Sequence, residues 1–182
     1  MTTEQTSLAT VPGRFDHATW RPVPVNFSRG ANQPRLLIVH IMQGSLEGTD
    51  GWFRNPASEV SSHFGLARDG RLWQWVNCDD MAWHAVLANP RSIGVECEGY
   101  SGNALTTRQL EQLGRIYAWA MDRYPAISAW LNTRPDTGSG LSWHGLGGAD
   151  WGGHPDCPGL PAVHQLADIL RTAGQLAAGA AG

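Results

Sequence analysis

The run at residues 36–41, LLIVHI, constrains the fold more than any other feature of this sequence. It is short, rich in β-branched residues and bounded by Pro34 and Gly44, a pattern typical of a buried central strand. His40 lies near its end, and an imidazole that is buried without a partner costs on the order of 1–3 kcal/mol. The run therefore predicts the middle of a β-sheet, together with a polar partner for His40 from elsewhere in the chain.

Two further segments predict strands beside this one. Residues 61–68 and 71–76 flank Asp69-Gly70, and an Asp-Gly pair between two alternating runs is a strong signal for a β-hairpin. Residues 92–99, SIGVECEG, also alternate. Because successive side chains of a strand point to opposite faces, this segment has an apolar and a polar side: Ile93, Val95 and Cys97 against Gly94, Glu96 and Glu98.

Helices are expected around these strands. One helix of about 18 residues begins after Thr106-Thr107 and stops before Pro125, since threonine is a good N-cap and the residue before proline disfavours helix. A short helix that breaks near Pro56 is expected over residues 49–60, and another helix over residues 161–178. The expected architecture is an α/β fold in which helices flank a central mixed sheet.

A chain of 182 residues corresponds to about 1.2 domains at roughly 150 residues per domain, so we expect a single domain over residues 35–178. Residues 1–34 contain four prolines and little periodicity, which predicts an extended arm around it, and residues 179–182 are expected to be a flexible tail. Residues 132–160 predict a long loop with one short strand at 141–143. A loop of this length inside a domain is usually functional.

Composition and charge exclude several classes of protein. All thirteen basic residues are Arg, and the net charge is −3, so the basic footprint of a nucleic-acid-binding protein is missing. No segment approaches 18 consecutive apolar residues, which excludes a transmembrane helix. The N-terminal segment lacks the basic and apolar regions of a signal peptide, so we expect synthesis in the cytoplasm. We also expect a monomer. Three irregularly spaced cysteines are not a disulfide framework, although one Cys78–Cys97 bridge stays open as an alternative.

Three residues could together hold a metal ion. His40 ends the buried strand, His144 begins the Gly-rich part of the long loop, and Cys157 lies in the turn HPDCPG. Two imidazoles and a thiolate, with a fourth position open, match a catalytic zinc site. The alternative is that each is an ordinary core residue, since a lone cysteine behaves as a small hydrophobe. The spacing of the three does not decide between these interpretations.

The order of six sequence blocks helps to decide between a metal site and ordinary core residues. These blocks are LLIVH, SSHFGLARDGRLWQW, AWHA, SIGVECEG, SWHG and DCPG. This order resembles the zinc-dependent N-acetylmuramoyl-L-alanine amidases of the type-2 amidase family, which includes phage endolysins and peptidoglycan recognition proteins. The resemblance runs from about residue 36 to 170. It implies a zinc ion held by His40, His144 and Cys157, and peptidoglycan or a muropeptide as the substrate.

The same resemblance exposes departures. Many members have a tyrosine where this chain has Ser62, and a lysine or threonine where it has Pro155. The anhydro-muropeptide branch uses a glutamate in the IGxE strand, so the resemblance assigns the general base to Glu96. The plainer interpretation is that Glu96 is a solvated strand residue, as Glu98 is expected to be. His154 is then the candidate partner of the oxyanion, or else a surface residue. His63 and His84 are weaker candidates for that role.

Contacts to the substrate are expected from residues that border this region. A tryptophan offers a flat apolar face and one donor, so some indoles could form a wall for the peptide stem, whereas one of Trp73 and Trp75 is expected in the core. The candidate substrate-binding residues are His84, Trp143, Trp151 and Ser62.

The function expected is cleavage of the amide bond between N-acetylmuramic acid and L-alanine, in an endolysin that reaches the cell wall through a holin. Three alternatives come with it. A non-catalytic recognition module would have lost zinc ligands, and a structural zinc protein would need His154 as a fourth ligand. A delivered effector or a cytosolic muropeptide-recycling amidase would have much the same sequence.

Overall fold

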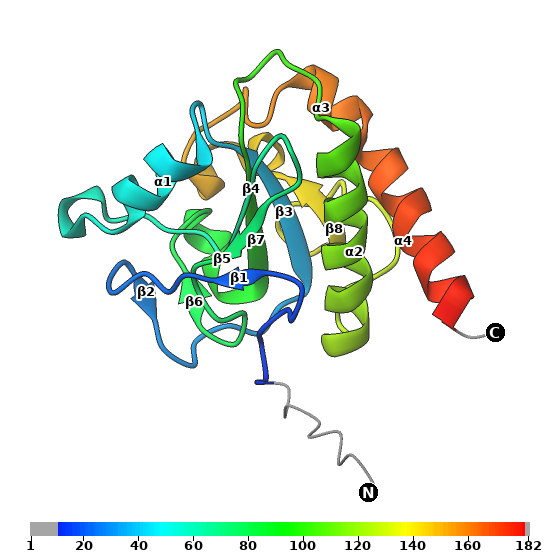
Figure 1. The fold of residues 1–182 in the computed structure, drawn as a ribbon, viewed down its shortest axis with the longest axis horizontal. Coiled ribbons are helices and arrows are strands. Elements are labelled where there is room, and N and C mark those ends of the chain that lie inside the picture. Colours follow the sequence, from blue (N-terminus) through cyan, green and yellow to red (C-terminus); the bar gives the residue numbers. More distant parts are fainter. Residues whose placement is uncertain (1–10, 181–182) are drawn as a thin grey trace, which may run out of the picture.

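The LLIVHI run forms strand β3 (Leu36–Ile41), and all six of its side chains are buried. The computed structural model describes residues 11–180 and places β3 within a six-stranded sheet (Figure 1). In spatial order the strands are β1 (Thr19–Trp20), β5 (Leu72–Gln74), β4 (Phe64–Leu66), β7 (Ser92–Cys97), β3 and β8 (Gly140–Trp143). The prediction of a central mixed sheet is confirmed.

The four strands β4, β7, β3 and β8 run parallel to one another, whereas β5 is antiparallel to β4. Strands β4 and β5 are the predicted hairpin around Asp69-Gly70, although each is shorter than its segment. Because the carboxyl ends of parallel strands meet at one edge of a sheet, the ends of β3, β7 and β8 lie together there. His40 and Glu96 are directly opposite one another at this edge.

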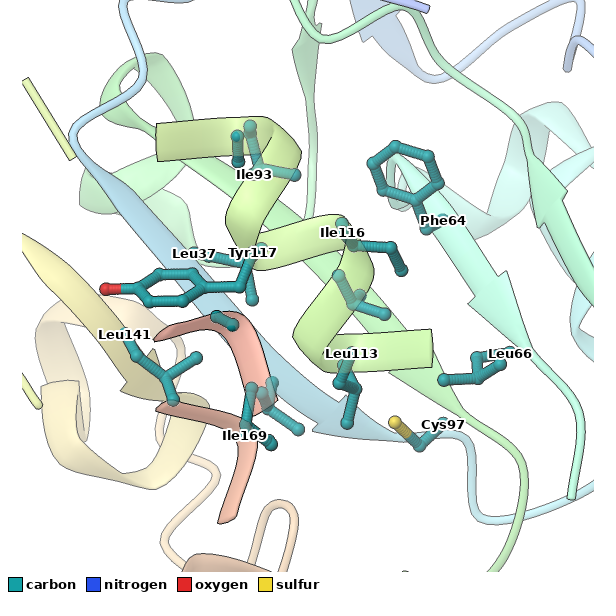
Figure 2. Close-up of a cluster of buried hydrophobic side chains, with 14 of the residues drawn as sticks. Leu37, Phe64, Leu66, Ile93, Cys97, Leu113, Ile116, Tyr117, Leu141 and Ile169 are labelled. Atoms are coloured by element: carbon teal, nitrogen blue, oxygen red, sulfur yellow. The ribbon is translucent and has the colours of Figure 1, made fainter. Parts of the chain in front are cut away.

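Helices α2 (Thr107–Arg123) and α4 (Leu166–Ala180) lie side by side over one face of the sheet (Figure 1). The predicted cap is confirmed, since Thr106 forms a capping box with Gln109. Figure 2 shows the apolar stripe of α2 and Ile169 of α4 packed on the strands. The strand residues of this cluster include Leu37, Val39, Ile41, Ile93, Val95 and Cys97.

The opposite face of β3 packs under two short 3-10 helices, η2 (Val86–Arg91) and η3 (His144–Trp151). Leu36 and Ile38 contact Ala85, Ala88 and Trp151 there. Since side chains alternate along a strand, His40 points to this second face. Glu96 does the same in β7. The apolar core and the polar edge therefore occupy different sides of the same strands.

The bounds of two predicted helices and the content of one predicted loop need correction. The expected helix over 161–178 is two helices, α3 (Leu160–His164) and α4, separated at Gln165. The side chain of Gln165 accepts from the Leu105 backbone N–H at 2.7 Å and donates to its carbonyl at 3.2 Å. The helix expected over 49–60 begins earlier, as α1 (Leu46–Phe53) capped by Ser45, and the predicted break near Pro56 is confirmed by the separate 3-10 helix η1 (Pro56–Ser58). The loop at 132–160 contains β8 and all of η3.

Residues 11–34 of the expected arm follow the domain edge. Strand β1 pairs with β5, and β2 (Phe27–Ser28) pairs with β6 (Met81–Ala82) in a separate sheet. Residues 1–10 of this arm and 181–182 of the expected tail lie outside the described residues, while α4 extends to Ala180. Cys78 and Cys97 are both free and buried. No helix in the described part of the chain is long and apolar enough to cross a membrane.

A buried carboxylate attaches α1 to the rest of the domain. Asp50 is 6% exposed and accepts hydrogen bonds from Arg54 at 2.9 Å, Arg21 at 3.0 Å and the Trp75 indole at 2.9 Å. Burial alone would raise the pKa of Asp50, but these three donors outweigh it and lower the pKa to about 2. Asp50 therefore joins α1 to the arm and to the segment that follows β5.

We expect Asp50→Asn to lower the free energy of unfolding by about 2 kcal/mol at pH 7, from a pKa difference of roughly two units. Because the pKa of Asp50 is lowered in the folded state, its contribution is present above pH 4 and is lost as the pH falls toward 2. Urea unfolding of both proteins between pH 7 and pH 2.5 checks this. Asp122→Asn, an exposed change on α2, is the control; a stability difference that stayed constant with pH would contradict the assignment.

A candidate metal centre at the carboxyl edge of the sheet

The three predicted ligands converge at the carboxyl edge. His40 is in β3, His144 directly follows the neighbouring strand β8, and Cys157 ends the loop after η3. One ligand atom from each lies within 4.8 Å of the others. The register of β3 and β8 pairs Val39 with Trp143, so the next residues, His40 and His144, become neighbours with ring centroids 4.3 Å apart.

A glycine lets the third ligand reach the two histidines. The Gly145 N–H donates to the Cys157 carbonyl at 2.7 Å. A Cβ at Gly145 would lie 2.5 Å from the Pro155 carbonyl oxygen and 3.1 Å from that of Cys157. The loop therefore folds back directly onto Gly145, which brings the thiol under the end of β3. There the Ile41 N–H points to Sγ at 3.4 Å.

Burial sets the charge of these groups. It lowers the pKa of His144 to about 4, and burial together with the neighbouring imidazoles lowers the pKa of His40 well below its ordinary value. Both rings are therefore neutral at pH 7, the form in which imidazole binds a metal. Burial, with Glu96 nearby, raises the pKa of Cys157 to about 12, and a bound cation would reverse that shift.

The second nitrogen of each histidine is already occupied. His144 Nε2 lies 2.7 Å from the Trp151 carbonyl oxygen, which can only accept, so Nε2 carries the proton and Nδ1 has the free lone pair. His40 Nε2 lies 3.0 Å from His84 Nδ1. Such contacts behind the ligands orient the rings of metal-binding histidines.

Glu96 lies beside the cluster. Its Oε1 is 3.8 Å from His40 Nδ1, and the side chain is 14% exposed. Burial raises the pKa of Glu96 to about 8. Glu98 is engaged elsewhere, since its carboxylate accepts from the Arg68 N–H at 2.9 Å. Of the two glutamates weighed from the sequence, Glu96 borders the cleft and Glu98 does not.

Two other histidines have separate positions. His154 is exposed, with its ring 4.9 Å from that of His144. Within residues 11–180 the metal-ligand cluster contains His40, His144 and Cys157 without His154, so a closed four-ligand site is not formed there. His63 is fully buried, donates to the Asp80 carbonyl and accepts from the Gly94 N–H, each at 3.0 Å. With both ring nitrogens bonded, His63 holds β4 against β7 and is unavailable to an oxyanion.

A cleft of about 880 Å³ opens above the cluster. Its lining includes the three candidate ligands, Glu96, His154 and His84, together with aromatic residues that the sequence did not single out, among them Trp52, Trp83 and Tyr100. Trp52 and Tyr100 are 55% and 58% exposed. Sequence position could have pointed to two of them, because Tyr100 directly follows the SIGVECEG segment and Trp52 lies in the helix after β3.

Three of the residues expected to contact substrate do not line this cleft. Trp151 is 1% exposed and packs on Leu36 and Ile38, because η3 turns its indole back onto the sheet. Trp143 packs against the main apolar cluster as the alternation of β8 requires. Ser62 is fully buried beside Gly94. These positions correct two expectations: that Trp143 and Trp151 form an apolar wall for the substrate, and that Ser62 contacts it.

Sequence comparisons with known proteins identify the family of this chain. The N-acetylmuramoyl-L-alanine amidase family Amidase_2 matches residues 30–160. N-acetylmuramoyl-L-alanine amidase A of Achromobacter lyticus is 38% identical over 162 residues, which are 88% of this chain and 80% of that protein. The 1,6-anhydro-N-acetylmuramyl-L-alanine amidase AmpD of Citrobacter freundii is 39% identical over 77 residues, or 38% of this chain and 41% of that protein.

A solved structure extends the comparison to the fold. The Staphylococcus aureus hydrolase AmiA aligns with a TM-score of 0.71 over 89% of this chain and 85% of that chain, at 15% identity. The family expected from the order of the sequence blocks is confirmed by the match over residues 30–160. This chain belongs to the Amidase_2 family and is an N-acetylmuramoyl-L-alanine amidase.

Proposed function

We propose that this amidase is zinc-dependent and cleaves the bond between the lactyl group of N-acetylmuramic acid and L-alanine in peptidoglycan. The observation that carries the proposal is the convergence of His40, His144 and Cys157 within 4.8 Å in a cleft that Glu96 also lines. Amide hydrolysis at neutral pH needs both an activated nucleophile and a proton acceptor, and this arrangement offers a place for each.

The donor set fits zinc. Two neutral imidazoles and one thiolate leave a fourth position for water or substrate, as in catalytic zinc sites. When bound, zinc would lower the pKa of water to about 7 and polarise the carbonyl group. The protein's own part is to hold His144 Nδ1 toward the cluster through the Trp151 carbonyl and Cys157 Sγ beside the Ile41 N–H.

Glu96 is proposed as the general base. Its carboxylate takes a proton from the attacking water and passes it to the leaving amine of L-alanine. The side chain borders the cleft next to His40. Burial raises its pKa to about 8, and a bound cation would lower the pKa again and so favour the carboxylate that accepts the proton. A proton acceptor with a pKa near the working pH is efficient in both directions of transfer.

His154 is proposed to stabilise the oxyanion. Other members place a lysine or threonine close to this point, but this chain contains no lysine and has Pro155 there. His154 is exposed at the cleft and lies against His144, so its ring can donate to the developing charge. Loss of one such donor costs roughly 3–4 kcal/mol of transition-state stabilisation in other hydrolases.

Polymeric peptidoglycan is proposed as the substrate, in the manner of an endolysin. The sequence match to amidase A covers 88% of this chain, whereas the matches to the anhydro-muropeptide amidases AmpD of Citrobacter freundii and Enterobacter cloacae cover 38% and 53%. The exposed rings of Trp52 and Tyr100 line the cleft and offer flat apolar faces to a muropeptide.

Removal of the metal tests whether the activity depends on zinc. EDTA should abolish activity on purified cell walls and Zn²⁺ should restore it, because the nucleophile depends on the metal. His40→Ala and Cys157→Ala should lose most bound zinc, measured by elemental analysis, and keep a cooperative unfolding transition, since the α2/α4 core lies on the other face of the sheet. His17→Ala, at an exposed position, is the control. Full activity in metal-free protein would exclude the zinc mechanism.

The products identify the bond and the substrate. Digestion of cell walls should release new N-terminal L-alanine without new reducing sugar ends, since a glycosidase needs paired carboxylates around a glycosidic bond. Mass spectrometry of the digest and an assay of reducing ends measure both. Soluble anhydro-muropeptide should be cleaved more slowly than intact walls at equal bond concentration; the reverse preference would indicate a recycling amidase.

Substitution of the glutamates tests the general base. Glu96→Gln should lower turnover about 10²–10⁴-fold, the usual contribution of such a group, with zinc content and melting temperature nearly unchanged. Glu98→Gln removes the same charge two positions away and should stay within a few-fold of wild type. If neither change slows turnover, the proton acceptor is another group, and His154→Ala becomes the informative variant.

A further inference from the structure

A chain of buried hydrogen bonds lies behind His40. The Ser92 hydroxyl donates to the Ala88 carbonyl at 2.7 Å, and Ser92 Oγ lies 3.2 Å from His84 Nε2. His84 Nδ1 in turn lies 3.0 Å from His40 Nε2. The three side chains are at most 9% exposed. We refer to this chain, from the Ala88 carbonyl to His40, as the His84 relay.

The relay has one consistent direction. A carbonyl oxygen can only accept, so the single proton of Ser92 Oγ is directed to Ala88. Ser92 Oγ must then accept from His84 Nε2–H. No carboxylate is part of the relay to balance a charged ring, and an unpaired buried cation is costly, so His84 is neutral with a lone pair on Nδ1. That lone pair accepts from His40 Nε2–H, which leaves the lone pair of His40 on Nδ1.

The sheet fixes the position of the relay. Ser92, Gly94 and Glu96 occupy the same face of β7, opposite Leu36, Ile38 and His40 of β3. A Cβ at Gly94 would lie 2.8 Å from Cγ and Nδ1 of His84, so the imidazole lies where a side chain at position 94 would be. Asn89 Oδ1 holds the backbone of this segment by accepting from the N–H groups of His84 and Ala85 at 2.9 and 2.6 Å.

We propose that Ser92 and His84 are positioning residues that hold His40 in the Nε2–H tautomer and so present its Nδ1 lone pair to the metal. The inference rests on the proposed zinc site and assigns His84 a role other than the substrate contact expected from the sequence. His144 needs no such relay, because the Trp151 carbonyl fixes its tautomer directly. Without the relay, His40 divides between two tautomers, one of which blocks Nδ1 with a proton.

Two amide substitutions of His84 separate the relay from simple packing. Asparagine carries its oxygen close to the place of Nδ1, within reach of His40 Nε2–H, whereas glutamine carries its amide one carbon further, near the place of Nε2. The relay therefore predicts tighter zinc binding for His84→Asn than for His84→Gln. A role in filling space predicts the opposite order, since glutamine is closer to histidine in volume.

Zinc affinity of the full chain, measured by competition with a chelator, is the first readout. His84→Gln should weaken zinc binding about 10–100-fold, the usual effect of losing a group that orients a ligand. Ser92→Ala should weaken it less. Ser62→Ala is the matched control, because Ser62 Oγ is buried near the same ring and has no hydrogen-bond partner in the described structure. Equal affinities for His84→Gln and wild type, or tighter binding by His84→Gln than by His84→Asn, would overturn the proposal.

Two further measurements separate the possible outcomes. In the metal-free protein, ¹⁵N NMR should show His40 protonated at Nε2, and a mixture of tautomers in His84→Gln. At saturating zinc, His84→Gln should regain KM and most of kcat; a KM that stays high would make His84 a substrate contact and overturn the relay. If the wild type itself binds no zinc, the proposed metal site fails, which is distinct from a wild type that binds zinc with no effect of His84.

Discussion

The parallel pairing of β3 with β7 is the constraint on which the remaining structure depends. Its register places Ile38 opposite Gly94 and His40 opposite Glu96. Alternation along both strands then assigns every second residue to the helices and the others to the opposite face. The same two strands thus provide the apolar floor under α2 and α4 and the polar groups of the cleft. A slip of one residue in this pairing would exchange the two sets.

Burial keeps the imidazoles of His40, His63, His84 and His144 neutral. Each of their ring nitrogens either has a hydrogen-bond partner or faces the candidate metal cluster. Both ring nitrogens of His63 form hydrogen bonds with backbone groups, of Asp80 and Gly94. Both ring nitrogens of His84 form hydrogen bonds with side chains. His40 and His144 each use one ring nitrogen in a hydrogen bond. The free nitrogens are therefore those that face the cluster. The distribution of hydrogen bonds, more than the number of histidines, separates the structural rings from the candidate ligand rings.

The elements predicted well from the sequence are those whose signals are local. The β3 run, the hairpin at Asp69-Gly70 and the cap at Thr106 depend on residues within a few positions of one another. The break at Gln165 was missed because its partner, Leu105, lies 60 positions away. The convergence of His40, His144 and Cys157 had no diagnostic spacing and came from the resemblance to a family. The burial of Trp151 was missed because it depends on how η3 turns onto Leu36 and Ile38.

The site is divided between strands and loops, and the strand part belongs to a fold that is found at low sequence identity. His40 and Glu96 belong to paired strands whose positions the core dictates, and AmiA keeps the same fold at 15% identity. His144, His154 and Cys157 follow strand β8 in one loop region, held by Gly145 and the Trp151 carbonyl. Groups on strands are placed by packing, whereas groups on loops vary with the substrate. This chain has no lysine, and the position near Cys157 where a different donor would have to lie belongs to the loop region, so that donor can change without altering the sheet that carries His40 and Glu96.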